Sequence, residues 1–506
     1  MISLTEPDNP VCPAILPIDY QEYMPPKILV AAFLLIVGSL SSTSVLTAET
    51  TAEAALPVPV QAVMNRRQLP NDSLSVVVVD VEGDGPALVH NGDVARNPAS
   101  VMKLVTTLVA LDVLGPAYRW QTEIWLQGEL NDGYLNGDLL LKGRGDPYLV
   151  KERVWLMMRD LRSRGLQRIG GDLLIDDSYF DIGNYDPSAF DRQPLRSYNV
   201  APNAMMLNFK TTRYFFEPAA NGNGVKIHMD PPLDNLEIVN RLTLRQGACR
   251  GYQRGVAIIP NDSFDRMTFS GRFPSGCRRY AMSRAALQHN EFTYGMFRSL
   301  WREAGGELEG GMRNIVFEPA DDDEPFLVFD SQPLADVVSR VNKYSNNVMA
   351  RHLLLTVAAE TLGAPGTETS GRAAVDQWLT ERGIDNASFE LSNGAGLSRT
   401  ARVTAWQLAE MLRYAYRQPY MPEYLASMSL VGLDGTTSRR FRSDDPVAGR
   451  AHMKTGSLDH VSAIAGYVHA RSGRRYAVAV LQNFPDVHRG YGDEVQAAVL
   501  RWVQNL

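Results

Sequence analysis

The sequence predicts an α/β protein whose antiparallel sheet and flanking helices are interrupted by a large β-rich insertion. An apolar strand pattern followed by a helical pattern occupies residues 73–114. Helical patterns and then three strand-like segments fill the chain after residue 333. Between these parts, short strands alternate with turns rich in Gly, Asn, Asp and Pro. We therefore expect residues 57–117 and 318–506 to form one domain and residues 118–317 to form an insertion of two subdomains.

The composition is that of an ordinary globular protein. The 506 residues are 45% hydrophobic and 21% charged, which excludes a disordered or fibrous protein. The 50 Lys+Arg against 57 Asp+Glu leave a net charge of −7, which is too small an imbalance to indicate nucleic-acid binding. Only eight of the 50 basic residues are lysines. A lysine in such an arginine-rich chain is a candidate for a role in which arginine cannot substitute, such as one that needs an amine able to lose its proton.

The N-terminal segment has the pattern of a secretory signal. Residues 28–40, ILVAAFLLIVGSL, are apolar or small and follow Lys27. This run is shorter than the roughly 20 residues that a membrane span needs. We expect a leader over residues 1–48, with Met24 as an alternative start and an uncleaved anchor as the alternative interpretation. The mature protein is then periplasmic or otherwise extracytoplasmic, with no stable membrane span.

The cysteines agree with export. Beyond the leader only Cys249 and Cys277 remain, and an even pair in an oxidising compartment predicts a disulfide. Two free buried thiols are the alternative. The histidines are scattered, and neither His-Glu-x-x-His nor Cys-x-x-Cys occurs, so we expect neither a metal nor a cofactor.

The expected elements follow in order along the chain. Residues 73–81 predict a strand and residues 86–90 its hairpin partner. A helix is expected from Ser100 to Leu114, with one apolar face. The insertion then contains short predicted strands at Trp120–Leu126, Leu139–Lys142, Leu173–Asp176, Val225–Met229 and Arg266–Ser270.

The C-terminal part predicts helices and then a sheet. Helical patterns run from Pro333, with a break at Tyr344–Asn347, and another helix is expected over Arg372–Arg382. Three antiparallel strands and a terminal helix are then predicted at Arg450–Lys454, Ala463–Ala470, Tyr476–Gln482 and Asp493–Leu506.

Ser100 and Lys103 form the only Ser-x-x-Lys in the chain. Residues three apart at a helix start share a face, so the amine can reach the hydroxyl. A serine hydroxyl needs an adjacent base to attack, and a desolvated lysine amine can be that base. The alternative is a serine that caps the helix beside a solvated lysine.

A second motif places polar side chains at a predicted junction between two helices. Ser345-Asn346-Asn347 lies at the break between two helices, where Ser345 could relay a proton and Asn347 could hold a substrate carbonyl. An ordinary polar helix junction is the alternative. Ser197-Tyr198-Asn199 fits the same Ser-x-Asn pattern, but we reject it because no predicted helix pair frames it.

Lys454-Thr455-Gly456-Ser457 contains the only Lys-Thr-Gly and lies on a predicted strand. A cation and a hydroxyl on a strand edge suit a substrate carboxylate, and Gly456 lets a ligand backbone approach closely. The N–H of Ser457 would be a second oxyanion donor beside that of Ser100. A lysine that protects an exposed edge strand is the alternative.

Together the three motifs resemble those of the penicillin-binding protein and serine β-lactamase superfamily. The sequence is most similar to the class C low-molecular-mass penicillin-binding proteins, the D-alanyl-D-alanine carboxypeptidase/endopeptidases. That family also has a large insertion between its first two motifs, and here 245 residues separate Ser100 from Ser345. The further matching stretches are GDLLLKGRGDPYL (137–149), GGDLLIDDSYF (170–180), GLDGTTSRRF (432–441) and KTGSLDHVSAIAGYV (454–468).

The resemblance implies a penicillin-binding/β-lactamase-like transpeptidase domain and a serine peptidase acting on peptidoglycan stem peptides. Ser100 would be acylated, Lys103 would take its proton, and Ser345 with Lys454 would pass a proton to the departing amine. The substrate would be held by Asn347 at the peptide amide and by Thr455 with Lys454 at the terminal carboxylate. A β-lactam would acylate the same serine and remain attached.

The chain departs from the family pattern at two acidic positions and one serine. Asn346 and Asn393 stand where the family usually has aspartate, and Ala395 stands where it usually has serine. These departures put the local hydrogen bonding in question, but not the nucleophile. A serine β-lactamase and a non-catalytic wall-binding or β-lactam-sensing protein are the alternative functions.

Overall fold

The structure, a computed structural model, describes residues 55–83, 85–220 and 224–506. The leader over residues 1–48 and the alternative start at Met24 lie outside the described residues. Within the described part of the chain, no helix has both the length and the apolar character needed to cross a membrane.

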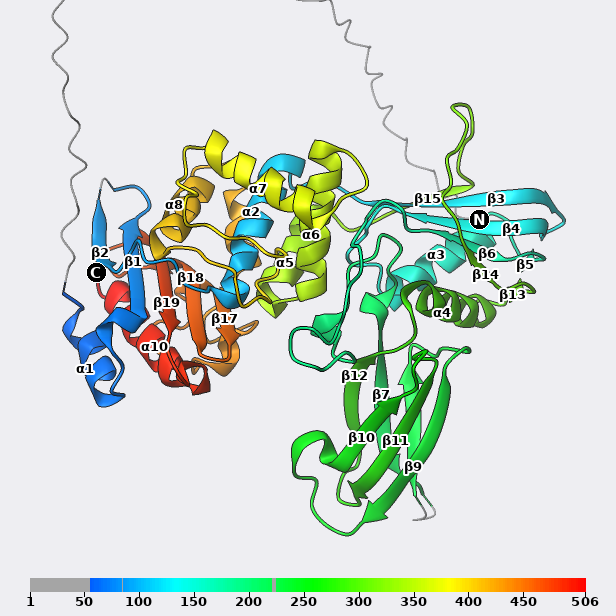
Figure 1. The fold of residues 1–506 in the computed structure, drawn as a ribbon, viewed down its shortest axis with the longest axis horizontal. Helices are drawn as coiled ribbons and strands as arrows, with labels where there is room; N and C mark the ends of the chain where they lie inside the picture. The colour runs from blue at the N-terminus through cyan, green and yellow to red at the C-terminus, as the bar shows by residue number, and fades with distance from the viewer. Residues whose placement is uncertain (1–54, 84, 221–223) are drawn as a thin grey trace, which may run out of the picture. The chain divides into compact units, whose positions relative to one another are not determined.

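A six-stranded sheet brings the two ends of the described chain together (Figure 1). The first strand pairs with the last one, and every neighbouring pair is antiparallel. This confirms the predicted antiparallel sheet. In spatial order its strands are β16 (Ser429–Leu430), β17 (Ala451–Leu458), β18 (Val461–His469), β19 (Arg475–Asn483), β1 (Leu74–Asp80) and β2 (Pro86–His90).

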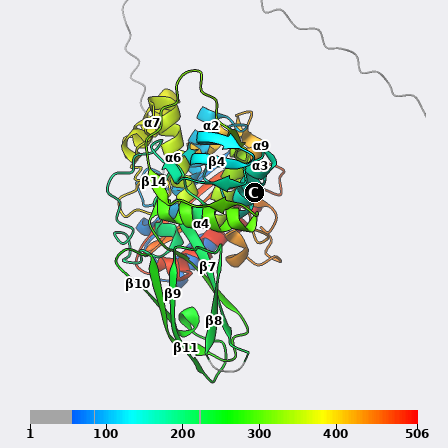
Figure 2. The same ribbon diagram turned by 90° about the vertical axis from the view of Figure 1, so that its right-hand side faces the viewer.

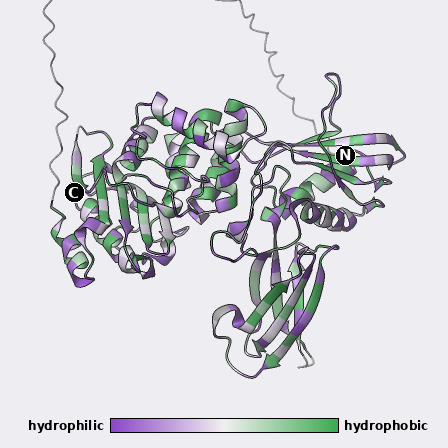
Figure 3. Cartoon of the chain, in the orientation of Figure 1, coloured by the Kyte–Doolittle hydropathy of each residue, from purple (hydrophilic) through white to green (hydrophobic). Residues whose placement is uncertain are grey.

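Both faces of this sheet are covered, which explains the run of valines in β1. Val76 and Val78 belong to the hydrophobic cluster under α1 and α10, whereas Val77 and Val79 belong to the cluster that contains the other helices. Hydrophobic residues therefore follow one another along the central strands (Figure 3). The helices are α1 (Val58–Arg66), α10 (Tyr491–Gln504), α2 (Lys103–Leu114), α5 (Leu334–Tyr344), α6 (Asn347–Leu362), α7 (Glu368–Glu381), α8 (Ala405–Tyr416) and α9 (Met421–Ser427).

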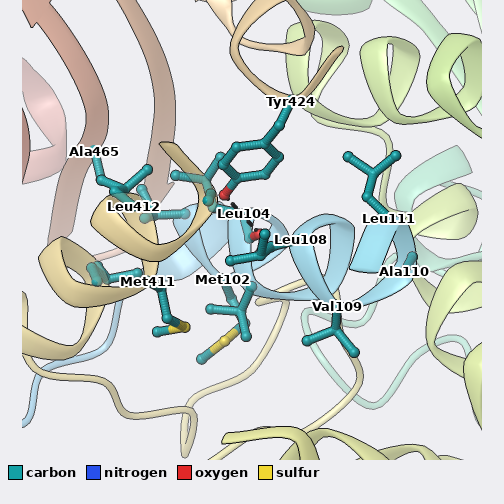
Figure 4. Packing of buried hydrophobic residues seen from close by; sticks show 14 of the residues in the cluster. Met102, Leu104, Leu108, Val109, Ala110, Leu111, Met411, Leu412, Tyr424 and Ala465 are labelled. Atoms are coloured by element: carbon teal, nitrogen blue, oxygen red, sulfur yellow. Dashed lines mark hydrogen bonds between the residues drawn. The ribbon is translucent and has the colours of Figure 1, made fainter. Parts of the chain in front are cut away.

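Helix α2 runs through the core and is buried on more than its one predicted face. Every residue from Lys103 to Leu111 is buried. In Figure 4 its leucines lie among side chains from α8 and β18, and the Tyr424 hydroxyl of α9 donates to the Leu104 carbonyl (3.0 Å). Such packing fixes the N-terminal end of α2 firmly, which is where Ser100 lies.

The first part of the insertion is a seven-stranded sheet with two helices. Helices α3 (Lys151–Ser163) and α4 (His289–Glu303) were not predicted, although α3 has apolar residues at helical spacing. The sheet shares one hydrophobic cluster with both helices. Its strands are β3 (Gln121–Asn131), β4 (Tyr134–Gly143), β5 (Arg168–Ile169), β6 (Leu173–Asp176), β13 (Glu307–Leu308), β14 (Met312–Asn314) and β15 (Leu327–Asp330). Because β15 pairs with β3, this sheet extends beyond residue 317, where the insertion was expected to end.

The second part consists of two three-stranded sheets, which lie together in both ribbon views (Figures 1 and 2). Aromatic rings from both sheets meet between them, with Phe216 and Phe269 at 5.4 Å. Cys249 and Cys277 form a disulfide here, as predicted. The strands are β7 (Thr211–Pro218), β8 (Val225–Asp230), β9 (Glu237–Arg245), β10 (Val256–Pro260), β11 (Arg266–Pro274) and β12 (Tyr280–Ala285).

Candidate active site

Ser100 lies in a tight turn at the start of the buried helix. Residues 99–102 form a 3₁₀ turn, η2 (Ala99–Met102), and the α-helix begins at Lys103 rather than at Ser100. Ala99 has a φ of 47°, and its N–H donates to the Asn97 side chain (2.8 Å). Asn97 is in turn held by Asn483 of β19, which donates to its carbonyl (3.0 Å). The C-terminal end of the central strand β19 therefore fixes the turn that carries Ser100.

The amine of Lys103 is fully buried and surrounded by three oxygens. Its Nζ lies 2.9 Å from Ser100 Oγ and 2.7 Å from Asn347 Oδ1, and it also bonds the Ala395 carbonyl. Burial lowers the pKa of Lys103 well below its usual value, and the nearby Lys454 cation lowers it further. A neutral amine has two N–H groups and one lone pair. Two fixed carbonyl oxygens take the N–H groups, which leaves the lone pair for the Ser100 hydroxyl.

The predicted break between helices is present and carries the second motif. Ser345 ends α5 in the left-handed conformation, with a φ of 57°, and α6 begins two residues later. Asn347 spans two parts of the chain because its Oδ1 accepts from Lys103 and its Nδ2 donates to the Tyr198 carbonyl (3.3 Å). The second hydrogen bond fixes which way the Asn347 amide faces.

Lys454 on β17 is the second fully buried amine. Its Nζ lies 2.9 Å from Ser345 Oγ and 2.7 Å from the Thr455 carbonyl. Burial lowers the pKa of Lys454 to about 7, and the neighbouring Arg440 cation contributes. The Lys454 amine therefore gains and loses its proton close to neutral pH.

Gly456 allows β17 to pass directly against the Ser100 turn. A Cβ at this position would lie 2.3 Å from the Pro98 carbonyl oxygen and 3.1 Å from the Ser100 nitrogen. Any side chain here would push the strand away. The close approach places Ser457 and Ser100 on the wall of one cavity.

That cavity has a volume of about 400 Å³ and is lined in part by residues to which the three motifs gave no role. Thr436, Arg439 and Arg440 line it, and the Thr455 hydroxyl donates to Thr436 Oγ1 (2.7 Å). All three lie in the stretch GLDGTTSRRF (432–441), which resembles the family but carries no predicted role. The wall opposite Ser100 is thus rich in cations and hydroxyls, as a carboxylate site requires.

The rejected Ser197-Tyr198-Asn199 motif lies beside the site and contributes a main-chain group to it. It forms a 3₁₀ turn, η3 (Ser197–Asn199), whose Tyr198 carbonyl accepts from Asn347. Its contribution is therefore a main-chain oxygen. No side-chain pattern in the sequence could have revealed it.

The three departures from the family pattern keep local hydrogen bonds. Asn346 caps α6, because its Oδ1 accepts from the Met349 N–H (3.1 Å). Asn393 accepts from the Ala395 N–H (3.1 Å) and donates to the Leu397 carbonyl (3.0 Å), and an ionised aspartate could not make the second bond. Ala395 contributes its carbonyl to Lys103, so its short side chain removes nothing from that contact.

Replacing Asn346 by alanine should lower the free energy of unfolding by about 1 kcal/mol, because the first turn of α6 loses its cap. Asn346→Asp should leave stability nearly unchanged, since a carboxylate oxygen can accept the same N–H. Denaturant unfolding measures both variants. The exposed Asn136, whose side chain makes no hydrogen bond with a described residue, provides the matched control Asn136→Ala. Equal losses in the alanine and aspartate variants would contradict the capping role.

A histidine–aspartate cluster follows the Lys-Thr-Gly strand and was not anticipated. His460, Asp486 and His488 bring possible ligand atoms within 4.8 Å of one another. However, both Nδ1 atoms already accept main-chain N–H groups, of Asp486 for His460 (3.1 Å) and of His460 for His488 (2.9 Å). A ring nitrogen that accepts a hydrogen bond has no free lone pair, and its partner nitrogen then holds the proton. This geometry favours a structural role, in which the two histidines hydrogen-bond two loops together, over a metal-binding site.

Comparisons with known proteins give matches over most of the chain. Residues 58–506 match the family model of the D-Ala-D-Ala carboxypeptidase 3 (S13) family. A D-alanyl-D-alanine carboxypeptidase of Actinomadura sp. strain R39 is 28% identical over 437 residues, covering 84% of this chain and 80% of that protein. The D-alanyl-D-alanine carboxypeptidase DacB of Haemophilus influenzae is 24% identical over 393 residues, covering 77% of this chain and 80% of that protein.

Solved structures share the fold. Penicillin-binding protein 4 from Haemophilus influenzae superposes with a TM-score of 0.75 at 21% identity, covering 89% of this chain and 100% of that chain. The same protein in complex with a β-lactam gives a TM-score of 0.68. Because the family model covers nearly all of the described residues, the chain belongs to the D-Ala-D-Ala carboxypeptidase (S13) family of serine peptidases.

Proposed function

We propose that this chain is a D-alanyl-D-alanine carboxypeptidase, an endopeptidase or both, acting on peptidoglycan stem peptides through an acyl-enzyme on Ser100. The observation that carries the proposal is the surroundings of the Lys103 amine. Asn347 Oδ1 and the Ala395 carbonyl take both N–H groups of a neutral amine, and the lone pair faces the Ser100 hydroxyl. A buried amine held in this way is a base prepared for one proton.

Acylation begins as Ser100 Oγ attacks the carbonyl between the two D-alanines and Lys103 takes its proton. Negative charge then develops on the carbonyl oxygen. The main-chain N–H groups of Ser100 and Ser457 are the donors available to it, since Gly456 keeps the strand against the turn. One such donor is typically worth about 3 kcal/mol in the transition state.

Departure of the terminal D-alanine needs a proton and a site for its carboxylate. The Lys454 amine and the Ser345 hydroxyl, 2.9 Å apart, form a path that can deliver the proton to the leaving amine. The Thr455 hydroxyl and the Lys454 ammonium bind the carboxylate, assisted by the positive potential of Arg439 and Arg440. Asn347 binds the peptide amide by exchanging its bond to the Tyr198 carbonyl. Water then releases the acyl group.

The similar proteins support the proposed substrate, and the apolar N-terminal segment supports the proposed compartment. Similar proteins are named D-alanyl-D-alanine carboxypeptidases, and a protein of the same fold has been solved with a β-lactam. We therefore expect β-lactams to acylate Ser100. The apolar segment 28–40 supports an extracytoplasmic location, where peptidoglycan is accessible.

Mass spectrometry after incubation with penicillin tests the proposal. The expected result is one covalent adduct, on the peptide that contains Ser100, and no adduct in Ser100→Ala. Ser197→Ala is the matched control, because Ser197 belongs to the rejected motif and should leave the adduct unchanged.

The fate of the adduct and of a D-Ala-D-Ala peptide separates the alternatives. Slow release of D-alanine with a lasting penicillin adduct supports the proposal. Rapid penicillin turnover would indicate a β-lactamase instead. Penicillin binding without turnover of the peptide or of crosslinked wall fragments would indicate a sensor.

A further inference from the structure

Two adjoining cavities lie within the insertion, apart from the Ser100 site. The larger has a volume of about 490 Å³ and the smaller about 390 Å³, and Pro194 and Leu195 line both. Neither cavity is lined by any residue that lines the Ser100 cavity. Their polar groups are therefore not explained by the acyl-transfer chemistry.

The charges around these cavities are of one sign. Among the described residues, four cations line them and no aspartate or glutamate does, although the whole chain has a net charge of −7. The cations are Arg192, Arg196 and Arg284 in the larger cavity and Lys210 in the smaller. Low-dielectric walls with charges of one sign concentrate the potential and attract the opposite charge.

The amine of Lys210 has no partner within the described part of the chain. It forms no hydrogen bond or ion pair with any described residue, and burial lowers its pKa to about 8. The nearest acid acting on it, Glu291, raises that pKa, but its Oε2 already accepts from the Gln288 N–H (3.0 Å) in the cap of α4. Keeping a half-buried cation without an acceptor costs free energy, and binding of an anion would offset that cost.

The backbone around Lys210 holds the amine in this place. Asn208, Phe209 and Lys210 form η4 (Asn208–Lys210), with φ values of 47°, 56° and 48°, a conformation that non-glycine residues rarely adopt. Asn208 fixes it by donating to the Leu149 carbonyl (2.9 Å) and the Thr211 carbonyl (2.8 Å). The side chain of Lys210 is thereby directed to the smaller cavity.

Arg192 provides a second cation whose guanidinium has no partner among residues 55–83, 85–220 and 224–506. It is exposed, and its guanidinium makes no hydrogen bond or ion pair with a described residue. The nearby carboxylate of Asp191 is occupied by the Tyr198 hydroxyl and the Asn199 amide, both at 2.7 Å. Arg192 and Lys210 are thus two separated cations, one in each cavity.

Much of the wall between and around these cations is aliphatic. Val200 and Leu287 line the smaller cavity, and Val256 and Ile258 line the larger. Carbon-rich walls fit a ligand with hydrocarbon between its acidic groups, which is true of a peptide and not of a polyphosphate. We propose that the two cavities form a binding site for an acidic peptide with at least two carboxylates.

Isothermal titration of the whole protein with tetra-glutamate tests this site, with tetra-glutamine as the uncharged comparison. We expect one tetra-glutamate to bind per chain and tetra-glutamine not to bind. The double variant Lys210→Met with Arg192→Gln should bind at least about tenfold more weakly, because two charge-assisted contacts are lost. Binding should persist in protein already acylated by penicillin, so this result is independent of the proposed acyl-enzyme.

The matched control removes the same two charge types elsewhere. Lys226 and Arg471 are exposed and line neither cavity, so Lys226→Met with Arg471→Gln should leave the affinity within about twofold. Thermal melting and the rate of penicillin acylation check that both double variants are folded. Equal weakening in both double variants, or equal binding of tetra-glutamine, would overturn the proposal. Binding of tripolyphosphate but not of tetra-glutamate would also overturn it, in favour of a phosphate ligand.

Discussion

Replacing Lys103 by arginine should lower the rate constant for acylation by about 10³-fold or more, although the positive charge is kept. The mechanism needs a lone pair 2.9 Å from the Ser100 hydroxyl, and a guanidinium does not lose its proton in proteins. Stopped-flow mixing with penicillin, with the adduct measured by mass spectrometry, gives the rate. The loss should equal that of Lys103→Met, which has no amine at all.

The comparison between the two variants separates a base from a cation. If Lys103 acted only as a positive charge, the arginine variant would retain much of the activity lost by the methionine variant. Lys151→Arg is the matched control, because Lys151 lies on the surface in an ion pair with Asp230 and should tolerate the change. Thermal melting shows whether each variant is folded, and Lys103→Met, an uncharged side chain of similar length, keeps the test usable if the larger guanidinium does not fit.

The parts of the site that the sequence predicted are those fixed by local geometry. Ser100 and Lys103 are three residues apart near the start of a predicted helix, and Ser345 lies where a helical pattern stops, so short stretches of sequence suffice to locate all three near helix ends. Of the contributions that were missed, Thr436, Arg439 and Arg440 supply side chains, and two others come from main-chain atoms. The Ala395 and Tyr198 carbonyls belong to residues whose side chains give no sign of the contact, and only the folded chain brings them to Lys103 and Asn347.

The secondary structure was likewise predicted in some places and missed in others. The strand predicted at Leu173–Asp176 has these bounds in the structure, since its apolar run is short and flanked by turns. The prediction of a β-rich insertion overlooked α3, whose Val154, Met157 and Leu161 have a readable helical spacing. The 3₁₀ turn at Ser100 was not readable, because it depends on Asn97 and the distant strand β19.

The free enzyme should lose activity toward carboxylate-terminated peptides as the pH rises above about 7, because Lys454 then loses its proton. Burial and the Arg440 cation lower the pKa of Lys454, so the ammonium that binds the substrate carboxylate is present below this pH and lost above it. The value of kcat/KM reports ionisations of the free enzyme and should fall up to about tenfold per pH unit on this side. The fall should appear mainly in KM. Burial and the Lys454 cation lower the pKa of Lys103, so the pH limb that requires a neutral Lys103 should lie below the pH at which an ordinary lysine would place it.

Two comparisons isolate Lys454 as the cause. A peptide whose terminal carboxylate is converted to an amide should not show the fall above pH 7, because it has no charge for the ammonium to bind. Arg440→Gln should move the fall to higher pH, since one cation acting on Lys454 is removed, whereas Arg439→Gln in the same cavity should leave it in place. An equal fall for the acid and the amide would assign the ionisation to the chemical step instead of to carboxylate binding.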